Sequence, residues 1–337
     1  MRKYIIFFII LSILFISGCQ SRLETFDGRT QGTTYHMIFE KGPFWRASFY
    51  LRQPTIEKTL RQFDLSLSTY EPGSVISRIN RNDTTVRVDD FFSVVLTRAY
   101  EVWKDTDGAF DMTVGPLVNA FGFGPQPDFE PDSVNVDSLL QYVGMDKVYI
   151  KNGRLIKASE GVQLDANAIA QGYAVDVIAE LFEKRRIRNY LVEIGGEIRT
   201  SGSKPGGLPW KVGIDRPVEN NFSPGEDLQV ILELGDQSLA TSGNYRKFYE
   251  RNGIKYAHSI DPRTGYPVMD RLLSATVIAT DCMTADAYAT AFMVMGLDST
   301  QSFLENRSDL EVYLVYSDES GAFQIWHTPG FERYIGE

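Results

Sequence analysis

The sequence has 337 residues, 43% of them hydrophobic, and its 44 acidic residues outnumber its 34 basic ones, which gives a net charge of −10 at pH 7. This balance argues against nucleic acid, or an anionic membrane surface, as a partner held by bulk charge. The length is ample for one large buried core or for two smaller ones.

The first 18 residues have the layout of a secretory signal, because a basic start precedes an apolar run from Tyr4 to Ile16. This run is too short for a comfortable membrane span. Small residues directly before Cys19 resemble the lipobox of bacterial lipoproteins, which implies that Cys19 becomes the mature N-terminus and carries the lipid. The alternative is an uncleaved anchor helix. Both interpretations place the rest of the chain outside the cytoplasm, at a membrane, on the periplasmic face.

Lipidation of Cys19 leaves Cys282 as the only remaining cysteine, so we expect no disulfide and a fold stabilised by its core. Residues 1–18 are then the lipoprotein signal peptide. Residues 19–30 are predicted to form a short lipidated tether, and residues 31–337 the folded domain.

Helical and strand-like patterns are mixed irregularly along this domain. Helical spacing predicts helices over residues 55–67, 74–80, 89–106, 132–142, 167–184 and 285–295. Alternating or β-branched runs predict strands over residues 33–40, 148–150, 154–158, 190–194, 210–214, 228–234, 238–241, 245–249, 254–260, 274–280, 310–317 and 323–326. Because no regular βαβ rhythm appears, the pattern favours a single mixed α/β domain of the α+β class over a doubly wound sheet.

The stretch DCMTADAYATAFMVMG, residues 281–296, places two polar side chains on a helix that is otherwise almost entirely apolar. Asp286 and Thr290 are four residues apart, so their oxygen atoms lie on one face of the helix. A carboxylate and a hydroxyl on one face suit a hard cation such as Mg²⁺. The alternative is structural, with Asp286 stabilising the helix start and Thr290 bonding back to a carbonyl.

Three further stretches hold polar side chains in apolar or turn-rich surroundings. They contain Asp111 and Thr113 within residues 108–116, Asp165 within residues 165–172, and His258, Asp261 and Arg263 within residues 257–267. Asp165 is either an N-cap or a carboxylate presented to a ligand, and carbonyl groups in the turn after it could ligate a cation. A lone histidine is more often structural than catalytic, but here a carboxylate and a guanidinium share its loop.

Several standard catalytic signatures are missing from the sequence. It contains no phosphate loop ending in Gly-Lys-Ser/Thr, no His-Glu-x-x-His, no paired Cys-x-x-Cys and no Gly-x-Ser-x-Gly. The residues alone therefore indicate an extracytoplasmic domain with oxygen donors suited to Mg²⁺ and glycine-rich loops, such as residues 108–124, suited to a large ligand.

Seven ordered blocks between about Gln31 and Gly296 resemble one known family. They read LSTYEPGSVISRIN, GAFDMTVGPLVNAFGFGP, LDANAIAQGYAVD, YLVEIGGEIR, ATSGNYRKFY, HSIDPRTGYPV and DCMTADAYATAFMVMG. These blocks are similar to those of the ApbE-like, Mg²⁺-dependent FAD:protein FMN transferases, which were formerly labelled thiamine-biosynthesis lipoproteins. The family has a single mixed α/β domain and is usually a periplasmic lipoprotein.

The resemblance implies a reaction in which FAD is split at its pyrophosphate, FMN is attached through a phosphoester to a Thr or Ser of a target protein, and AMP is released. Typical acceptors are flavoprotein subunits of membrane redox complexes. The implied Mg²⁺ ligands are Asp286, Thr290 and the backbone carbonyl of Ala168. The implied FAD contacts are Gln31, Tyr70, Ala109, Phe110, Asp111, Asp165, Gln171 and Ile260. The implied catalytic residues are Asp286 and His258, the latter for proton handling or phosphate contact.

Two positions depart from the family pattern. The family often has Met where this chain has Gln31, so contact with the ligand would be a hydrogen bond instead of a thioether contact. It commonly has Lys where this chain has Gln171, so phosphate binding would depend more on Mg²⁺ and Arg263. Neither change removes a predicted metal ligand.

Two other functions use the same residues. An FAD pyrophosphatase would replace the protein hydroxyl with water and give free FMN and AMP. A lipid-anchored flavin-binding or carrier protein would hold FAD without turnover, which leaves the pairing of Asp286 with Thr290 unexplained. No motif in the sequence matches thiamine chemistry.

Overall fold

The computed structural model describes residues 22–41, 51–125, 134–217, 227–244, 248–251, 254–257 and 259–336. Its central feature is an eight-stranded sheet whose neighbouring strands all run antiparallel. From edge to edge the strands are β1 (Arg22–Thr30), β2 (Thr33–Lys41), β5 (Tyr190–Ile194), β6 (Glu197–Ser201), β9 (Ser238–Gly243), β12 (Leu272–Ala279), β13 (Glu311–Ser317) and β14 (Phe323–His327). Separate two-stranded sheets are formed by β3 (Val148–Lys151) with β4 (Arg154–Lys157), β7 (Trp210–Asp215) with β8 (Leu228–Leu234), and β10 (Phe248–Arg251) with β11 (Ile254–Ala257).

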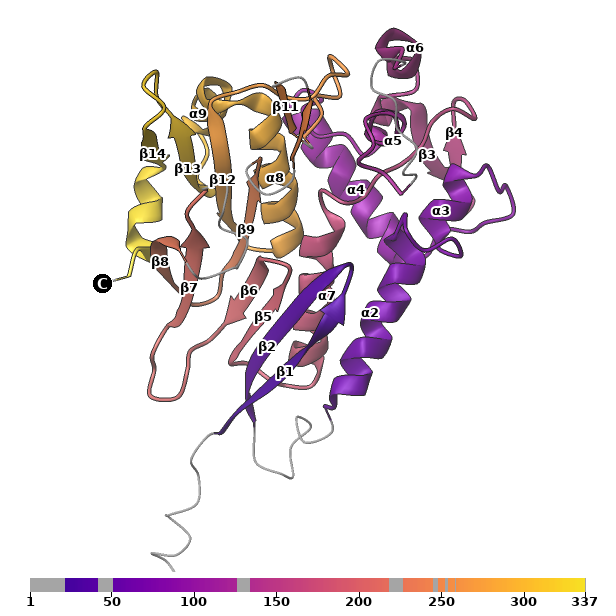
Figure 1. Cartoon of the computed structure of the whole chain (residues 1–337). Helices are drawn as coiled ribbons and strands as arrows, with labels where there is room; N and C mark the ends of the chain where they lie inside the picture. Colours follow the sequence, from indigo (N-terminus) through magenta and orange to yellow (C-terminus); the bar gives the residue numbers. More distant parts are fainter. Residues whose placement is uncertain are drawn as a thin grey trace, which may run out of the picture.

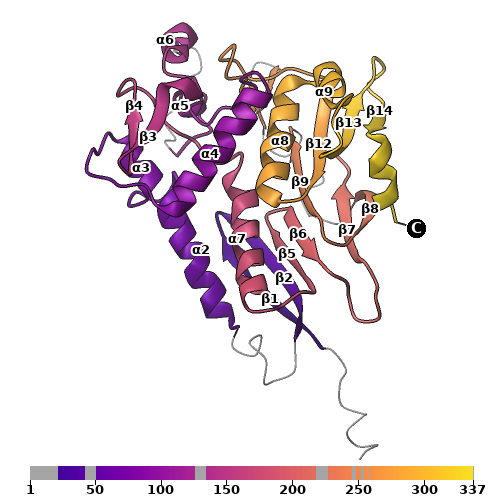
Figure 2. The same cartoon turned by 180° about the vertical axis from the view of Figure 1, so that it is seen from behind.

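Two helices cover one face of the large sheet (Figure 1). Helix α7 (Ala170–Lys184) packs on β5 and β6, and α8 (Cys282–Met295) packs on β9 and β12. Helices α2 (Gln53–Leu67) and α4 (Asp90–Asp105) pack in turn against α7 and α8, which form a middle layer (Figure 2). The shorter helices are α3 (Val75–Asn80), α5 (Gly115–Ala120), α6 (Val136–Leu140), α9 (Leu297–Leu304) and the 3-10 turns η3 (Met145–Lys147) and η4 (Pro329–Tyr334).

Both faces of the central strands are buried. Successive residues of a strand point to opposite faces, so Ala240 and Val277 join the core beneath α7 and α8, while Leu239 and Ile278 join a second core. The second core is closed by β7, β8 and η4. Burial on both sides explains why β12 reads as an almost continuous β-branched and apolar run.

The predicted helix over residues 285–295 is confirmed as α8, in which only Thr290 and Met295 are not fully buried. The helix begins at Cys282, earlier than predicted, because Asp281 caps it by accepting a hydrogen bond from the Thr284 amide at 2.8 Å. In the part of the chain that the structure describes, no helix combines the length and the apolar character needed to cross a membrane.

The start of the domain differs from the prediction. Residues 22–30, assigned to the tether by the sequence, form β1 and pair along their whole length with β2. The two strands are joined by Gln31 and Gly32, whose φ angles of 51° and 73° suit a tight hairpin. Edge strand β1 alternates exposed and half-buried side chains, so it lacks the apolar signal that marks an inner strand. Cys19 and the signal segment lie outside the described residues.

Several other elements were not predicted, among them the 3-10 turns η3 and η4. Strand β6, helix α5 and helix α9 all lie in stretches that the sequence analysis left as turns, loops or connections. The helix predicted over residues 167–184 begins only at Ala170, because residues 167–169 form a turn.

We predict that Phe292→Ala will lower the free energy of unfolding by about 3–5 kcal/mol, as is usual for a fully buried phenylalanine. Phe292 is 0% exposed on α8 and packs edge-to-face on Phe303, with ring centroids 5.6 Å apart. The measurement is urea denaturation. Phe323→Ala serves as the matched control, because Phe323 is 44% exposed on edge strand β14 and should cost less than about 1 kcal/mol. Equal losses in the two variants would contradict the burial assigned to α8.

Candidate functional site

Asp286 lies one turn inside α8, and its carboxylate is almost completely buried, with 5% of the residue exposed. Its Oδ2 accepts a hydrogen bond from the backbone N–H of Gly172 at 2.9 Å. Burial, together with the charge of the neighbouring Asp176 carboxylate, raises the pKa of Asp286 to about 7, although the hydrogen bond from Gly172 lowers it. Among the described residues, the groups that shift this pKa are the Gly172 N–H and the Asp176 carboxylate, and neither is a cation. A bound cation would supply the missing compensation for this buried charge.

Thr290 lies one turn after Asp286, on the same face of the helix, and is only half-buried. Its Oγ1 is 3.2 Å from Oγ of Ser242 on β9. Ser242 has no assigned role in the sequence analysis, although it lies in the block ATSGNYRKFY. Ser242 lies two residues after Ala240 on the strand, so it shares the face of β9 that packs toward α8, which only the structure shows.

The turn that carries Ala168 is held close to α8 by a glycine. Ala168 is half-buried in residues 167–169, directly before α7. A Cβ atom at Gly172 would lie 2.3 Å from the carbonyl oxygen of Cys282 and 2.7 Å from Cβ of Asp286. Only glycine therefore lets the first turn of α7 approach the first turn of α8 this closely.

These groups fit a hard divalent cation chemically. A carboxylate, a hydroxyl and a backbone carbonyl are the oxygen donors that Mg²⁺ prefers. Within the described residues no group of three or more His, Cys, Asp or Glu could hold a metal ion. A cation held by the single carboxylate of Asp286 would therefore need additional oxygen atoms from water or from a bound phosphate.

Asp165 is neither a simple N-cap nor a free carboxylate. Its Oδ1 accepts from the Asn167 N–H at 2.7 Å, and its Oδ2 accepts from the Asn167 amide at 3.1 Å, which closes the turn before α7. Its own N–H donates to the Met112 carbonyl at 2.7 Å. The charge of Asp165 raises the pKa of Tyr70, after burial, so the two side chains lie near one another. Tyr70 is 60% exposed, which leaves its ring open to a ligand.

The loop with Ala109, Phe110 and Asp111 presents buried side chains. Phe110 belongs to the main core. The Asp111 carboxylate accepts from the Thr113 N–H at 2.6 Å and from the Met145 N–H at 3.2 Å, so it braces its own loop against η3. Burial raises the pKa of Asp111 to about 6. This packing favours the backbone of the loop, more than its side chains, as the part that meets a ligand.

Gln31 and Gln171 both lie near the end of the sheet where β2 begins and β5 ends. Gln171 Nε2 lies 3.4 Å from the Ile194 carbonyl, and its side chain occupies the space where Gly195 lacks a Cβ. The same missing Cβ would touch Thr33, two residues after Gln31. Gln31 Nε2 is buried and has no hydrogen bond of ordinary length among the described residues, but the Gln31 side chain lies beside Asp64 of α2. Burial raises the pKa of that carboxyl group, and the Gln31 side chain lowers it.

The loop after β11 packs against the loop with Ala109. Arg263 makes two hydrogen bonds of 2.9 Å to the Asp261 carboxylate, and the Cβ position of Gly108 lies 3.6 Å from the Arg263 side chain. Ile260 is buried in a small apolar cluster with residues of α5 and α6, among them Leu117. His258 lies outside the described residues, and its role stays a prediction.

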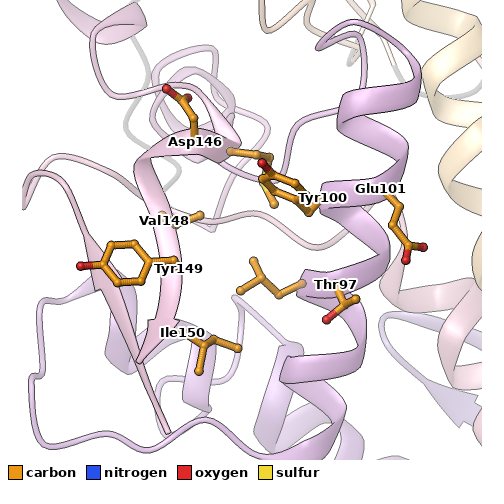
Figure 3. A pocket seen from close by; sticks show the side chains of 9 residues that line it. Thr97, Tyr100, Glu101, Asp146, Val148, Tyr149 and Ile150 are labelled. Carbon is orange, nitrogen blue, oxygen red and sulfur yellow. The ribbon is translucent and has the colours of Figure 1, made fainter. Parts of the chain in front are cut away.

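A separate hollow of about 610 Å³ lies between α4 and the segment that runs from η3 into β3 (Figure 3). It is lined by Leu96, Thr97, Tyr100, Glu101, Met145, Asp146, Val148, Tyr149 and Ile150. None of the predicted site residues is among them. Its link to the candidate site is indirect, through the hydrogen bond from Met145 to Asp111.

We predict that Gly172→Ala will destabilise the protein by about 1–3 kcal/mol or more, because the added methyl group meets backbone atoms that cannot turn away. The measurement is the unfolding midpoint in urea. Gly235→Ala is the matched control, because no atom lies within 4 Å of its Cβ position. A Gly172→Ala protein as stable as this control would show that α7 and α8 do not need the close approach.

We predict that the stability difference between the native protein and Asp111→Asn will depend on pH. Because the pKa of Asp111 is raised, its carboxyl favours the folded state most below the ordinary value of 3.8, and this contribution is lost as the pH rises through about 6. Between about pH 4 and about pH 7.5, the native protein should lose up to roughly 3 kcal/mol relative to the asparagine variant. Urea titrations at both pH values test this, and a constant difference would contradict it.

Comparison with known proteins identifies relatives along the whole chain. The sequence matches the model of the ApbE family over residues 31–314. It is 36% identical over 320 residues to the FAD:protein FMN transferase of Haemophilus influenzae, with 91% of each chain covered. It is 34% identical to the FAD:protein FMN transferase of Vibrio cholerae, with 100% of each chain covered.

Solved structures match equally well. The flavin transferase ApbE from Vibrio cholerae superposes with a TM-score of 0.82 at 34% identity, over 94% of this chain and 100% of that chain. The apo form of the flavinyl transferase ApbE from Pseudomonas stutzeri gives a TM-score of 0.82 at 33% identity, over 95% of this chain and 99% of that chain. These similarities confirm the predicted family, the mixed α/β fold and the transferase class, whereas the roles of individual residues stay predictions. The chain belongs to the ApbE family.

Proposed function

We propose that this chain is a Mg²⁺-dependent FAD:protein FMN transferase, which splits FAD, attaches FMN through a phosphoester to a Thr or Ser of a target flavoprotein, and releases AMP. Relatives named FAD:protein FMN transferase support the reaction class. The observation that carries the metal requirement is the buried Asp286 carboxylate, which lies one turn from the Thr290 hydroxyl. Among the described residues, the groups that shift its pKa are the Gly172 N–H and the Asp176 carboxylate, and neither is a cation.

In this proposal Asp286, Thr290 and the Ala168 carbonyl hold Mg²⁺. When bound there, the cation would offset the negative charge of the FAD pyrophosphate and of the AMP leaving group. The close contact at Gly172 supports this set, because it brings the turn with Ala168 against the first turns of α8. The protein contributes mainly by positioning the two substrates.

Three described features support contacts with FAD. The exposed ring of Tyr70, close to Asp165, can stack on an aromatic ring of the ligand. The buried amide of Gln31 can donate to a ligand oxygen. The backbone of residues 109–111 borders the same region, through the hydrogen bond from Asp165 to Met112, and Ile260 supports the adjacent loop.

Proton transfer from the acceptor hydroxyl would fall to His258 or to a nearby carboxylate. The resemblance of HSIDPRTGYPV to the family supports His258 for this role. Arg263 lies in the same loop, where its guanidinium is paired with Asp261, and it is a candidate for contact with a phosphate group of FAD.

We further propose that Cys19 is lipidated and holds the enzyme at the periplasmic face of a membrane, near its acceptor. The apolar run and the small residues before Cys19 support this location. A flavoprotein subunit of a membrane redox complex, carrying an accessible Thr or Ser, is the partner that fits such an anchored enzyme.

We predict that the purified chain, incubated with FAD, Mg²⁺ and an acceptor subunit, will add the mass of one FMN to the acceptor, and that EDTA will abolish the gain. Thr290→Val and Asp286→Asn should each reduce the initial rate by at least about 100-fold. Mutation of a residue that only orients a metal ligand usually costs 10–100-fold in activity, so loss of a ligand itself should cost at least as much. Intact-protein mass spectrometry measures both results.

Thr276→Val is the matched control for Thr290→Val. Each threonine hydroxyl has a hydroxyl partner, Thr241 for Thr276 at 2.9 Å and Ser242 for Thr290 at 3.2 Å, but only Thr290 is a proposed ligand. The control should keep the native Mg²⁺ dependence. Release of AMP and FMN without a gain in acceptor mass would instead establish a pyrophosphatase, and FAD binding without AMP release would establish a carrier.

A further inference from the structure

Helices α7 and α8 exchange hydrogen bonds at their N-termini. The Gly172 N–H of α7 donates to Asp286 Oδ2 of α8 at 2.9 Å. In return, the Cys282 N–H and the Met283 N–H of α8 donate to Asp176 of α7, at 3.0 Å to Oδ1 and 2.8 Å to Oδ2. Each helix thus offers first-turn amides to a carboxylate of the other helix, with Asp286 about one turn inside α8 and Asp176 nearly two turns inside α7.

This exchange solves an electrostatic problem. Figure 2 shows α7 and α8 nearly end to end, and the hydrogen bonds identify the facing ends as the two N-termini. Each N-terminus carries roughly half a positive charge from the helix dipole, so two facing N-termini repel one another and also repel a cation. The carboxylates of Asp176 and Asp286 place negative charge at this junction. Asp176 therefore allows the close approach of the two helices.

Asp176 is itself fixed from a third side. The residue is 4% exposed, and its Oδ1 also accepts from Arg199 Nη1 of β6 at 2.8 Å. Arg199 is held in turn by Glu183 near the end of α7, at 3.1 Å. The Asp176 carboxylate therefore accepts from three donors, two on α8 and one on β6. These hydrogen bonds connect the start of α8 to both α7 and the sheet.

We propose that Asp176 is a positioning residue for the metal site, which sets the start of α8 so that Asp286 and Thr290 face the turn that carries Ala168. This inference rests on the proposed function, in which those residues hold a divalent cation. Asp176 does not touch the cation in this account. It acts through the two backbone amides of α8 that it accepts.

The experiment measures Mn²⁺ binding to the full-length chain in the absence of FAD, from the electron paramagnetic resonance signal of free Mn²⁺. Asp176→Asn keeps the shape of the side chain but turns one acceptor into a donor that faces an N–H group. We expect Mn²⁺ to bind roughly 10–100-fold more weakly to this variant, as for other residues that orient metal ligands.

Asp281→Asn is the matched control, because it also removes one negative charge from the start of α8. Asp281 accepts from the Thr284 N–H of its own helix at 2.8 Å and from the hydroxyl of the preceding Thr280 at 3.5 Å, and neither of these donors belongs to α7. Asparagine caps a helix about as well as aspartate does, so this variant should keep nearly native stability and a Mn²⁺ affinity close to native. Equal weakening of Mn²⁺ binding in the two variants would mean that charge alone matters, and it would overturn the positioning role.

Asp176→Glu separates position from charge and replaces Asp176→Asn if that variant does not fold. The longer side chain keeps the charge but moves the oxygens within a close-packed junction, so Mn²⁺ binding should still weaken. Native Mn²⁺ affinity in both Asp176 variants would overturn the inference while leaving the proposed metal site intact. Absence of Mn²⁺ binding to the native chain would overturn the metal site itself, and the inference with it.

Discussion

The junction of two helix N-termini is the constraint on which the arrangement of this protein depends. Facing helix ends of the same polarity are unfavourable unless negative groups lie between them. Here two buried carboxylates, Asp176 and Asp286, lie at the junction and accept backbone amides across it. Gly172 permits the contact because a side chain there would overlap α8. The sheet below and helices α2 and α4 above bury this polar junction, which strengthens its hydrogen bonds.

The surrounding loops use the same chemical device. Asp111 accepts the Met145 amide and so joins two loops, while Asp165 accepts the Asn167 amide and closes the turn before α7. A buried carboxylate is costly unless it is hydrogen-bonded, so each of these contacts favours one loop conformation over others. The candidate site is therefore built from loops whose backbone is held in place, which suits an enzyme that works mainly by positioning substrates.

The contacts of some predicted site residues indicate a supporting role within the protein. Asp111 was expected to face the ligand, but its carboxylate has partners within the protein. Ile260 is part of an apolar cluster, so it supports a loop from below. Conversely, Asp176 and Ser242 were not singled out, although both contact α8. Their partners are 106 and 48 residues away along the chain, beyond the reach of any local pattern.

The sequence by itself determined what depends on near neighbours: the apolar helix α8, the shared face of Asp286 and Thr290, the inner strands of the sheet other than β6, and the family, through its ordered blocks. Periodicity and short motifs act over one or two turns, so they survive in the bare sequence. Only the tertiary structure decided that β1 pairs with β2 and that the N-termini of α7 and α8 meet. Those contacts depend on the shapes and charges of segments that are brought together only when the sheet has formed.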